Sequence, residues 1–278
     1  MLTTDLSPAA HAFDAVADIF DSRFTPWLSV AAQRRAVRTA LAAAFPAGAR
    51  LIELGGGTGE DALWLAERDR AVLMTDASPT MVRIAAAKLA GHDNAAARIL
   101  PAEGLETFAL EAGARGENPF DGAYSNFAGL NCVSDLAPVA RGLARLVRPG
   151  GRILLVLFGV LCPGEMIVES LRGRPRNALR RLAHGDVHAR LGARDFTVRY
   201  HRAAALERHL RPWFQPAGRK GIGVFVPPSA AEPWISRHPR FLDLLETLDR
   251  RVSRALAVFG DHILYQFVRT DAGVVEGA

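Results

Sequence analysis

The stretch from Arg50 to Asp61, RLIELGGGTGED, decides the fold: a short apolar strand runs directly into a turn with four glycines, and a helix follows. Glycines let a backbone approach a ligand closely, and open α/β sheets bind ligands beyond the carboxyl ends of their strands. A dinucleotide-binding turn would carry glycine where Glu60 stands, because a charged side chain suits a pyrophosphate poorly. The spacing therefore favours a nucleotide-like ligand without phosphates.

An acidic residue follows the next predicted strand. Asp76 comes at the end of the apolar segment 71–75, after the glycine turn, and Ser78-Pro79 opens the next helix. At this place in such folds, a carboxylate accepts hydrogen bonds from the two hydroxyls of a ribose. The glycine turn and Asp76 together predict a cofactor that contains adenosine and no phosphate.

Strands and helices alternate on both sides of this motif. Apolar segments at 50–54, 71–75, 97–100, 120–125 and 152–158 predict strands, and helical periodicity lies between them and over 11–45. Further strands are expected at 221–226 and 262–269, with a helix over 240–258. Such alternation predicts an α/β fold with a parallel sheet that is covered on both faces.

Composition excludes several classes of protein. The chain has 278 residues, 49% of them hydrophobic, and its two cysteines are too few for a disulfide framework. No signal peptide is recognisable, and the longest apolar run, Ile153–Met166, is broken by Gly159 and Pro163. We expect a soluble, cytoplasmic protein with no metal site.

The positive charge is unevenly placed. The net charge is +5, and thirteen basic but only three acidic residues lie between Leu171 and Lys220. A solvated arginine-rich face, an anionic small acceptor and an anionic membrane surface all remain open explanations. Nucleic acid is disfavoured because few aromatic residues are interleaved with the arginines.

Four successive segments, ELGGGTGED, TDASPTMV, PFDGAYSNFAGLN and LARLVRPGGRILLV, resemble motifs of the class I S-adenosylmethionine-dependent methyltransferases. The resemblance implies a Rossmann-like, seven-stranded, mostly parallel sheet with helices on both faces and the last strand antiparallel. It also implies a single domain over 1–278. Its parts would be an N-terminal helical lid (1–46), a cofactor-binding core (47–159), an inserted helical cap that binds the acceptor (160–216) and the terminal strands (217–270).

The resemblance implies S-adenosylmethionine as the cofactor. Glu53 and the glycine turn would hold its methionine part, Asp76 its ribose, and Ala77 and Met81 would flank its adenine. The expected cofactor-binding residues are Glu53, Gly55, Gly56, Gly57, Gly59, Asp76, Ala77, Met81, Ala102, Glu103 and Asn126. Two features depart from the family pattern: Pro101 stands where an acidic residue often contacts the adenine, and the N-terminal helix carries phenylalanines in place of tyrosine.

Catalytic residues are harder to assign. A sulfonium methyl group is a potent electrophile, so an enzyme can act largely by positioning the acceptor and excluding water. Tyr124 and Asn126, at the loop after the fourth strand, and His201, which could accept a proton near neutral pH, are the candidates.

Three further charged residues are candidates for the site. Arg35, on the helix before the first strand, is one candidate partner for the carboxylate of the cofactor. We expect Glu165 and Glu169 at solvated helix positions, with a role as base as the alternative.

We therefore predict in-line methyl transfer to a small organic acceptor of anionic or lipidic character. The alternatives are a nicotinamide-dependent oxidoreductase and a non-catalytic cofactor-binding partner protein. Peripheral membrane contact and a monomeric or homodimeric state are both compatible with the sequence.

Overall fold

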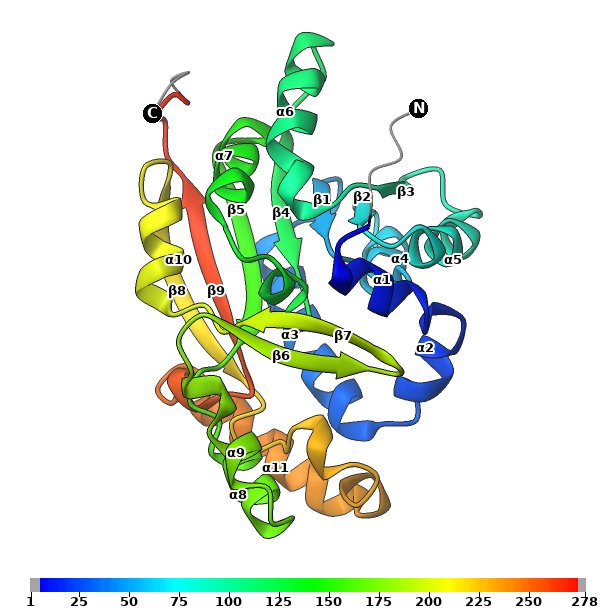
Figure 1. Ribbon diagram of the computed structural model, residues 1–278. Coiled ribbons are helices and arrows are strands. Elements are labelled where there is room, and N and C mark those ends of the chain that lie inside the picture. Colours follow the sequence, from blue (N-terminus) through cyan, green and yellow to red (C-terminus); the bar gives the residue numbers. More distant parts are fainter. Residues whose placement is uncertain (1–5, 275–278) are drawn as a thin grey trace.

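A seven-stranded sheet forms the centre of the computed structural model, which describes residues 6–274 (Figure 1). Its strands are β1 (Arg50–Leu54), β2 (Ala71–Asp76), β3 (Ala95–Ile99), β4 (Phe120–Ser125), β5 (Val147–Phe158), β8 (Phe214–Ile222) and β9 (His262–Arg269). They lie in the order β3-β2-β1-β4-β5-β9-β8. The first five pair in parallel and β9 is antiparallel to both neighbours, as predicted.

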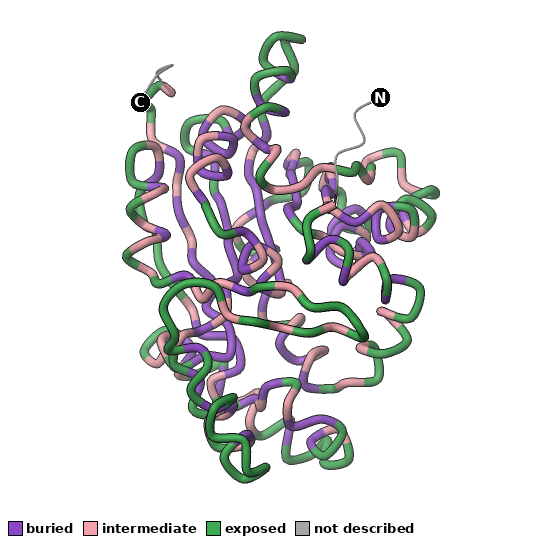
Figure 2. The backbone as a smooth tube through the Cα atoms, in the orientation of Figure 1, coloured by how far each residue is buried: buried purple, intermediate pink, exposed green. Residues whose placement is uncertain are grey.

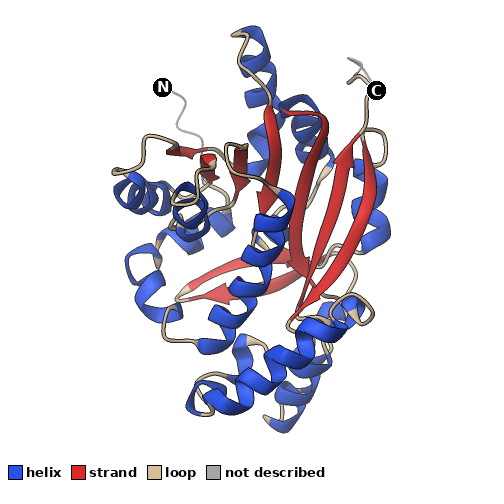
Figure 3. Ribbon diagram, turned by 180° about the vertical axis from the view of Figure 1, so that it is seen from behind, coloured by secondary structure: helices blue, strands red, loops and turns tan. Residues whose placement is uncertain are grey.

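Helices cover both faces of the sheet (Figures 1 and 3). They are α1 (Pro8–Asp14), α2 (Ala17–Phe24), α3 (Leu28–Ala44), α4 (Glu60–Ala66), α5 (Pro79–Leu89), α6 (Leu105–Ala114), α7 (Ala137–Leu146), α8 (Pro163–Leu171), α9 (Pro175–Ala178), α10 (Ala203–Leu210) and α11 (Pro239–Val252). Successive side chains of a strand point to opposite faces, so Ile153 and Leu155 pack with α6 and α7, whereas Leu154 and Val156 pack with α3 and α4. The buried residues therefore follow the strands (Figure 2).

The helical cap predicted over 160–216 is wrong in part. Between short helices, residues Asp186–Leu191 (β6) and Arg194–Arg199 (β7) form an antiparallel hairpin, whose two-residue turn includes Gly192 at φ 60°. Alternation of Val187, Ala189 and Leu191 with polar residues is the strand signal here. The hairpin crosses in front of the sheet toward α1 (Figure 1).

Two other predicted boundaries are wrong. The strand expected at 221–226 begins earlier, at Phe214, and includes Pro216, which an edge strand tolerates because its backbone is unpaired on one side. The helix expected over 240–258 ends at Val252. The helices predicted over 11–45 and the last strand, 262–269, are confirmed.

The division of the chain into lid, core, cap and terminal strands stays a prediction, and its limits at residues 1 and 278 lie outside the described residues. Within residues 6–274, no helix is long and apolar enough to cross a membrane.

Candidate cofactor and acceptor site

The glycine turn follows β1 at the carboxyl edge of the sheet. Gly56 donates its N–H to the Thr75 carbonyl at 3.0 Å, which holds the turn against β2. A Cβ on Gly56 would meet Met74 Cγ at 2.6 Å and the Glu53 carboxyl at 2.7 Å. Only glycine fits there, and Gly59 adopts φ 80°, so the turn needs both glycines.

The Glu53 carboxyl lies beneath this turn. Glu53 is 1% exposed, and its Oε2 has no hydrogen-bond partner among the described residues. Burial, and then the charge of Asp61, raise the pKa of Glu53 to about 8. Tyr124 faces Glu53 in register from β4 and is fully buried. Burial, and then the charges of Glu53 and Asp61, raise the pKa of Tyr124 well above the usual value. An orphaned buried acid of this kind fits a cationic ligand group.

Asp76 ends β2 beside the turn. Its Oδ2 accepts the N–H of Gly57 at 2.9 Å and its Oδ1 accepts that of Ser78 at 2.9 Å. Burial nevertheless raises the pKa of Asp76, because desolvation outweighs these bonds. Each oxygen keeps a second lone pair, so the fixed carboxylate can accept two hydroxyls.

The expected adenine-side residues gather around Asp76. Ala77 follows it directly, Met81 is buried in the first turn of α5, and the Asp76 carbonyl accepts the N–H of Leu100 at 2.9 Å. This bond brings in the short 3-10 helix η1 (Ala102–Gly104), which carries Ala102 and Glu103.

One neighbour was not predicted. Burial, and then the charges of Asp76 and Glu103, raise the pKa of Cys132 to about 12, so Cys132 lies near both carboxylates. Nothing in the local sequence around Cys132 signals this.

Asn126 joins the loop after β4 to the glycine-turn helix. Its Nδ2 donates to Asp61 Oδ2 at 2.6 Å, and its Oδ1 accepts the N–H of Phe127 at 2.7 Å. Asp61 is buried and also accepts Arg38 Nε at 2.7 Å. Phe127 and Ala128 have φ of 47° and 60°, a strained conformation that this network holds in place.

The N-terminal helices bind to the cofactor side of the sheet. Asp14 Oδ1 accepts the Ser78 hydroxyl at 2.7 Å, and Asp21 Oδ1 accepts the Thr58 hydroxyl of the glycine turn at 2.6 Å. Lys88 bridges Asp21 and Glu60, at 2.6 Å from each. These contacts hold the first helices against the glycine turn and α5, and their role as a lid stays a prediction.

Aromatic residues line the other side of the loop after β4. His262, at the start of β9, stacks on Phe158 with ring centroids 4.9 Å apart and meets Phe127 edge-on at 5.9 Å. Tyr200 packs against Phe158, and the Arg34 guanidinium lies 4.8 Å from the Phe127 ring centre. These side chains form a packed cluster at the carboxyl edge, which we call the aromatic wall.

His262 is chemically unusual within that wall. Its Nδ1 is buried, has no hydrogen-bond partner within residues 6–274, and lies 3.4 Å from Asp261 Oδ2. Burial lowers the pKa of His262, although Asp261 partly opposes this effect. The imidazole is therefore neutral near pH 7. In the sequence, the Asp261-His262 pair before an apolar strand is only a weak signal for such a role, weaker than that of His201.

His201 lies in a different setting. It is buried, and its Nε2 is 2.8 Å from the Val133 carbonyl, where it acts as donor. Burial lowers its pKa. This contact fixes the loop after β4 and commits one ring nitrogen, so the predicted catalytic role of His201 gains no support and stays a prediction.

Two expectations about charged residues are wrong. Arg35 pairs with Glu246 at 2.7 Å, away from the glycine turn, whereas Arg34 lies 3.4 Å from Asp61. Glu165 and Glu169 are buried rather than solvated. The local sequence could not predict these positions, because Glu246 is distant from Arg35 in the chain and Arg181 follows Glu165 in the next segment.

The partner of Glu165 is Arg181, itself 5% exposed. Arg181 donates to Glu165, to the Gly159 carbonyl at 3.1 Å, and to the Asp261 carbonyl and Oδ1, both at 2.7 Å. Asp261 also accepts Gln33 Nε2 at 3.0 Å. This cluster ties the cap, the end of β5, the start of β9 and α3 together directly behind His262.

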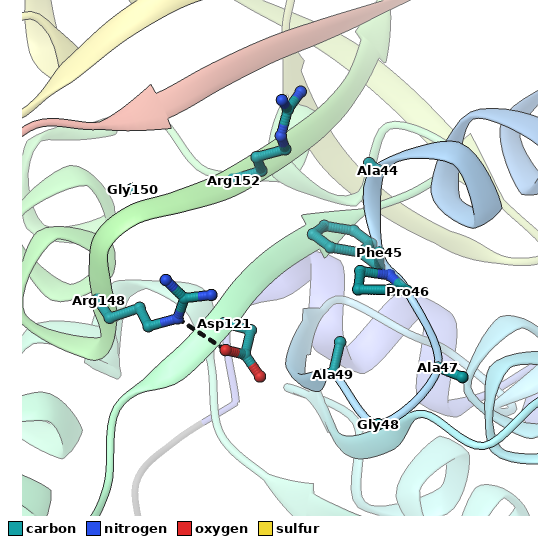
Figure 4. Close-up of a pocket in the computed structure, with 10 residues that line it drawn as sticks. All are labelled: Ala44, Phe45, Pro46, Ala47, Gly48, Ala49, Asp121, Arg148, Gly150 and Arg152. Atoms are coloured by element: carbon teal, nitrogen blue, oxygen red, sulfur yellow. Dashed lines mark hydrogen bonds and ion pairs between the residues drawn. The ribbon is translucent and has the colours of Figure 1, made fainter.

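A cavity of about 330 Å³ lies at the opposite edge of the sheet (Figure 4). It is bordered by the turn 44–49 and by the amino ends of β4 and β5, where Arg148 Nε donates to Asp121 at 2.7 Å. Ligands of open α/β sheets bind at the carboxyl edge, whereas this cavity lies at the amino edge, and its Arg148 is already paired with Asp121. We assign this cavity no part in the site.

Comparison with known proteins agrees with the geometry. The model of the methyltransferase domain family matches residues 51–151. No curated protein sequence matches the chain.

Among solved structures, the chain is similar to the CcbJ methyltransferase from Streptomyces caelestis, with a TM-score of 0.57, 15% identity, and coverage of 92% of this chain and 96% of that one. A putative S-adenosylmethionine dependent methyltransferase from Listeria monocytogenes gives a TM-score of 0.56 and 14% identity, over 87% of this chain and 100% of that one. The [4+2]-cyclase SpnF gives a TM-score of 0.53 and 17% identity, over 85% of this chain and 80% of that one. At such identities the likeness shows the fold alone. The family model and the fold confirm the resemblance seen in the sequence: residues 51–151 form a methyltransferase domain.

Proposed function

We propose that this protein transfers a methyl group from S-adenosylmethionine to a small organic acceptor, and that the acceptor binds at the aromatic wall. The observation that carries the proposal is the orphaned Glu53 carboxyl under a turn where only glycine fits, next to the fixed carboxylate of Asp76. A cationic amino acid end and a ribose match these two acids.

The chain's residues fit each part of the cofactor. Glu53 and the turn Gly55–Gly59 would hold the methionine part, and Asp76 the ribose. Ala77, Met81, Ala102 and Glu103 would surround the adenine, and Asn126 would border the reacting methyl group. When bound, the cofactor supplies an electrophilic methyl group on a sulfonium, which leaves as a neutral thioether once the acceptor has attacked in line.

His262 supports the acceptor half of the proposal. It stands between Phe127 and Phe158, beyond the loop that carries Asn126, and its neutral imidazole can accept a proton. Asp261, 3.4 Å from Nδ1, would stabilise the imidazolium that forms. We therefore assign proton transfer to His262, whereas His201 and Tyr124 are held for packing and positioning.

The side chains of the aromatic wall limit the chemical class of the proposed acceptor. Three aromatic rings favour a flat or apolar acceptor body, and Arg34, at the Phe127 face, favours an anionic group on it. An acceptor with an acidic O–H or N–H would use His262 as base. This agrees with the anionic or lipidic acceptor expected from the sequence.

Calorimetry with S-adenosylhomocysteine tests the cofactor half of the proposal. Binding at micromolar concentrations is expected, and no heat at tens of micromolar would refute it. Transfer of a deuterated methyl group to metabolite and lipid extracts, followed by mass spectrometry, then identifies the acceptor. With that acceptor, His262→Asn should lower kcat and remove the acid limb of the pH profile, while the exposed control His184→Asn should not.

The rivals predict different results. The same fold carries a cyclase, so cofactor binding without any methyl transfer would favour a different activity. A nicotinamide oxidoreductase would instead bind reduced nicotinamide cofactor. Glu60, which is paired with Lys88 in the first turn of α4, opposes a pyrophosphate there.

A further inference from the structure

Helix α8 is amphipathic, but it buries its acidic side chains and exposes its aliphatic ones. Its two acids, Glu165 and Glu169, are 3% and 6% exposed, whereas Ile167 and Leu171 are 60% and 84% exposed. Exposed neighbours four residues apart lie on one helix face. Soluble proteins usually expose acids and bury aliphatic residues, so this outward aliphatic face needs a separate explanation.

The outward face continues beyond α8. Leu179 and Leu182, which follow α9, are exposed, as are Trp234 and Phe241 near the start of α11. The two segments are neighbours, because Val168 of α8 packs on the small core that contains Ile235 and Leu242, adjacent in sequence to the exposed rings. Figures 1 and 3 show α8, α9 and α11 at the same end of the molecule. We call the six exposed residues the apolar end: Ile167, Leu171, Leu179, Leu182, Trp234 and Phe241.

Positive charge borders the apolar end. Arg172, Arg174, Arg176 and Arg180 are exposed on the cap, and Arg237 and Arg240 are exposed beside Trp234 and Phe241. The carboxylates of α8 are turned inward, and Arg180 and Arg172 reach them only from their outer side. Asp243 is the acid exposed nearest to Phe241 in the chain. The surface therefore combines aliphatic and aromatic side chains with a surplus of cations.

We propose that the apolar end docks this protein on a membrane surface that contains anionic lipid. Aliphatic and aromatic side chains enter the boundary between headgroups and acyl chains, while arginines bind lipid phosphates. A symmetric second copy fits less well, because it would place the same arginines against each other. Charge complementarity thus selects an anionic lipid surface as the occupant.

The apolar end is connected to the aromatic wall through buried contacts of the cap. The cap that presents Ile167 and Leu171 is joined through Arg181 to Asp261, the neighbour of His262 in the aromatic wall. An acceptor dissolved in the membrane would enter beside the site without crossing water. Docking itself does not depend on methyl transfer, so it can be tested without a known acceptor.

Sedimentation with vesicles tests the proposal on the full chain. We expect binding to phosphatidylcholine vesicles with about 30 mol % phosphatidylglycerol, little binding to phosphatidylcholine alone, and loss of binding between about 0.1 and 0.5 M NaCl. Leu171→Glu should lower the partition coefficient roughly tenfold or more. Arg174→Gln with Arg176→Gln should lower it roughly 20- to 30-fold, since each cation near such a surface contributes about fivefold.

Matched variants separate docking from general effects. Leu110→Glu, on the exposed face of α6, and Arg208→Gln with Arg211→Gln, on and after α10, should bind vesicles as the wild type does. All variants should keep the wild-type melting temperature, because the altered side chains are exposed.

Three outcomes would overturn the proposal. These are equal sedimentation with and without anionic vesicles, equal losses in the control variants, and a dimer in ultracentrifugation that Leu171→Glu dissociates.

Discussion

Replacing Glu53 with glutamine is expected to stabilise the cofactor-free protein and to weaken cofactor binding at the same time. The carboxyl is 1% exposed, and its Oε2 lacks a hydrogen-bond partner, so its charged form is costly in the folded state. Glutamine keeps the shape of the side chain and cannot ionise. The comparison therefore isolates the cost of the charge.

The pKa sets the size and the sign of the effect. Folding raises the pKa of Glu53 from 4.5 to about 8, so between these values the folded protein binds a proton that the unfolded chain has released. The stability of the wild type then falls as the pH rises, by about 1.4 kcal/mol per pH unit, and levels off above the folded pKa. From pH 5.5 to pH 7.5, the wild type should lose about 2–3 kcal/mol relative to Glu53→Gln.

Urea unfolding of both proteins at several pH values between 5.5 and 8.5 measures this difference. The free energy of unfolding of Glu53→Gln minus that of the wild type should rise with pH, and calorimetry should show at least about a tenfold loss of S-adenosylhomocysteine affinity. Parallel pH profiles for the two proteins would refute the raised pKa. Unchanged affinity would refute the placement of a cationic cofactor group at Glu53.

Three further changes test the buried Arg181 cluster, the glycine turn and Asp76. Arg181→Leu leaves the buried carboxylate of Asp261 without its arginine and that of Glu165 with Arg180 alone, so urea unfolding should show a loss of about 3–5 kcal/mol of stability. Gly56→Ala places a methyl group 2.6–2.7 Å from its neighbours and should abolish S-adenosylhomocysteine binding in calorimetry while the circular dichroism spectrum stays that of the wild type. Asp76→Asn replaces an acceptor oxygen with a donor that opposes a backbone N–H and should lower the same affinity about tenfold or more.

The sequence predicts the cofactor side of the site well because its signals are local. Each strand end and the glycine turn are specified by residues close together in the chain, and the parallel pairing of β1 and β2 then brings Asp76 to the turn without further information. The N–H of Gly57 and the Asp76 carboxylate meet because two adjacent strands end at the same edge.

The acceptor side could not be predicted in the same way. The Arg181–Asp261 contact joins residues 80 positions apart, and Asn126 meets Asp61 across 65 positions. Burial of Glu165 depends on its contacts with Arg180 and Arg181, because a carboxylate stays inside only where a cation accompanies it. His262 has only a weak signal in the sequence for the same reason, since the rings that surround it, Phe127 and Phe158, come from separate segments of the chain.

The arginines of the cap have different physical roles. Arg181 is buried, and its five N–H groups donate to buried oxygens and hold the cap to the sheet. Arg180 shares the same buried acid from its outer side, while Arg174 and Arg176 lie exposed beside an aliphatic face. If the whole excess served an anionic acceptor, these exposed arginines would line the aromatic wall. The cations found there are Arg34, from α3, and Arg181, whose guanidinium lies 4.9 Å from the Phe158 ring centre and is already paired with buried carboxylates. The charge of the cap therefore faces outward, and acceptor binding and membrane docking should respond to different arginines: Arg34→Gln should change the acceptor KM and spare vesicle binding, and Arg174→Gln with Arg176→Gln should do the reverse.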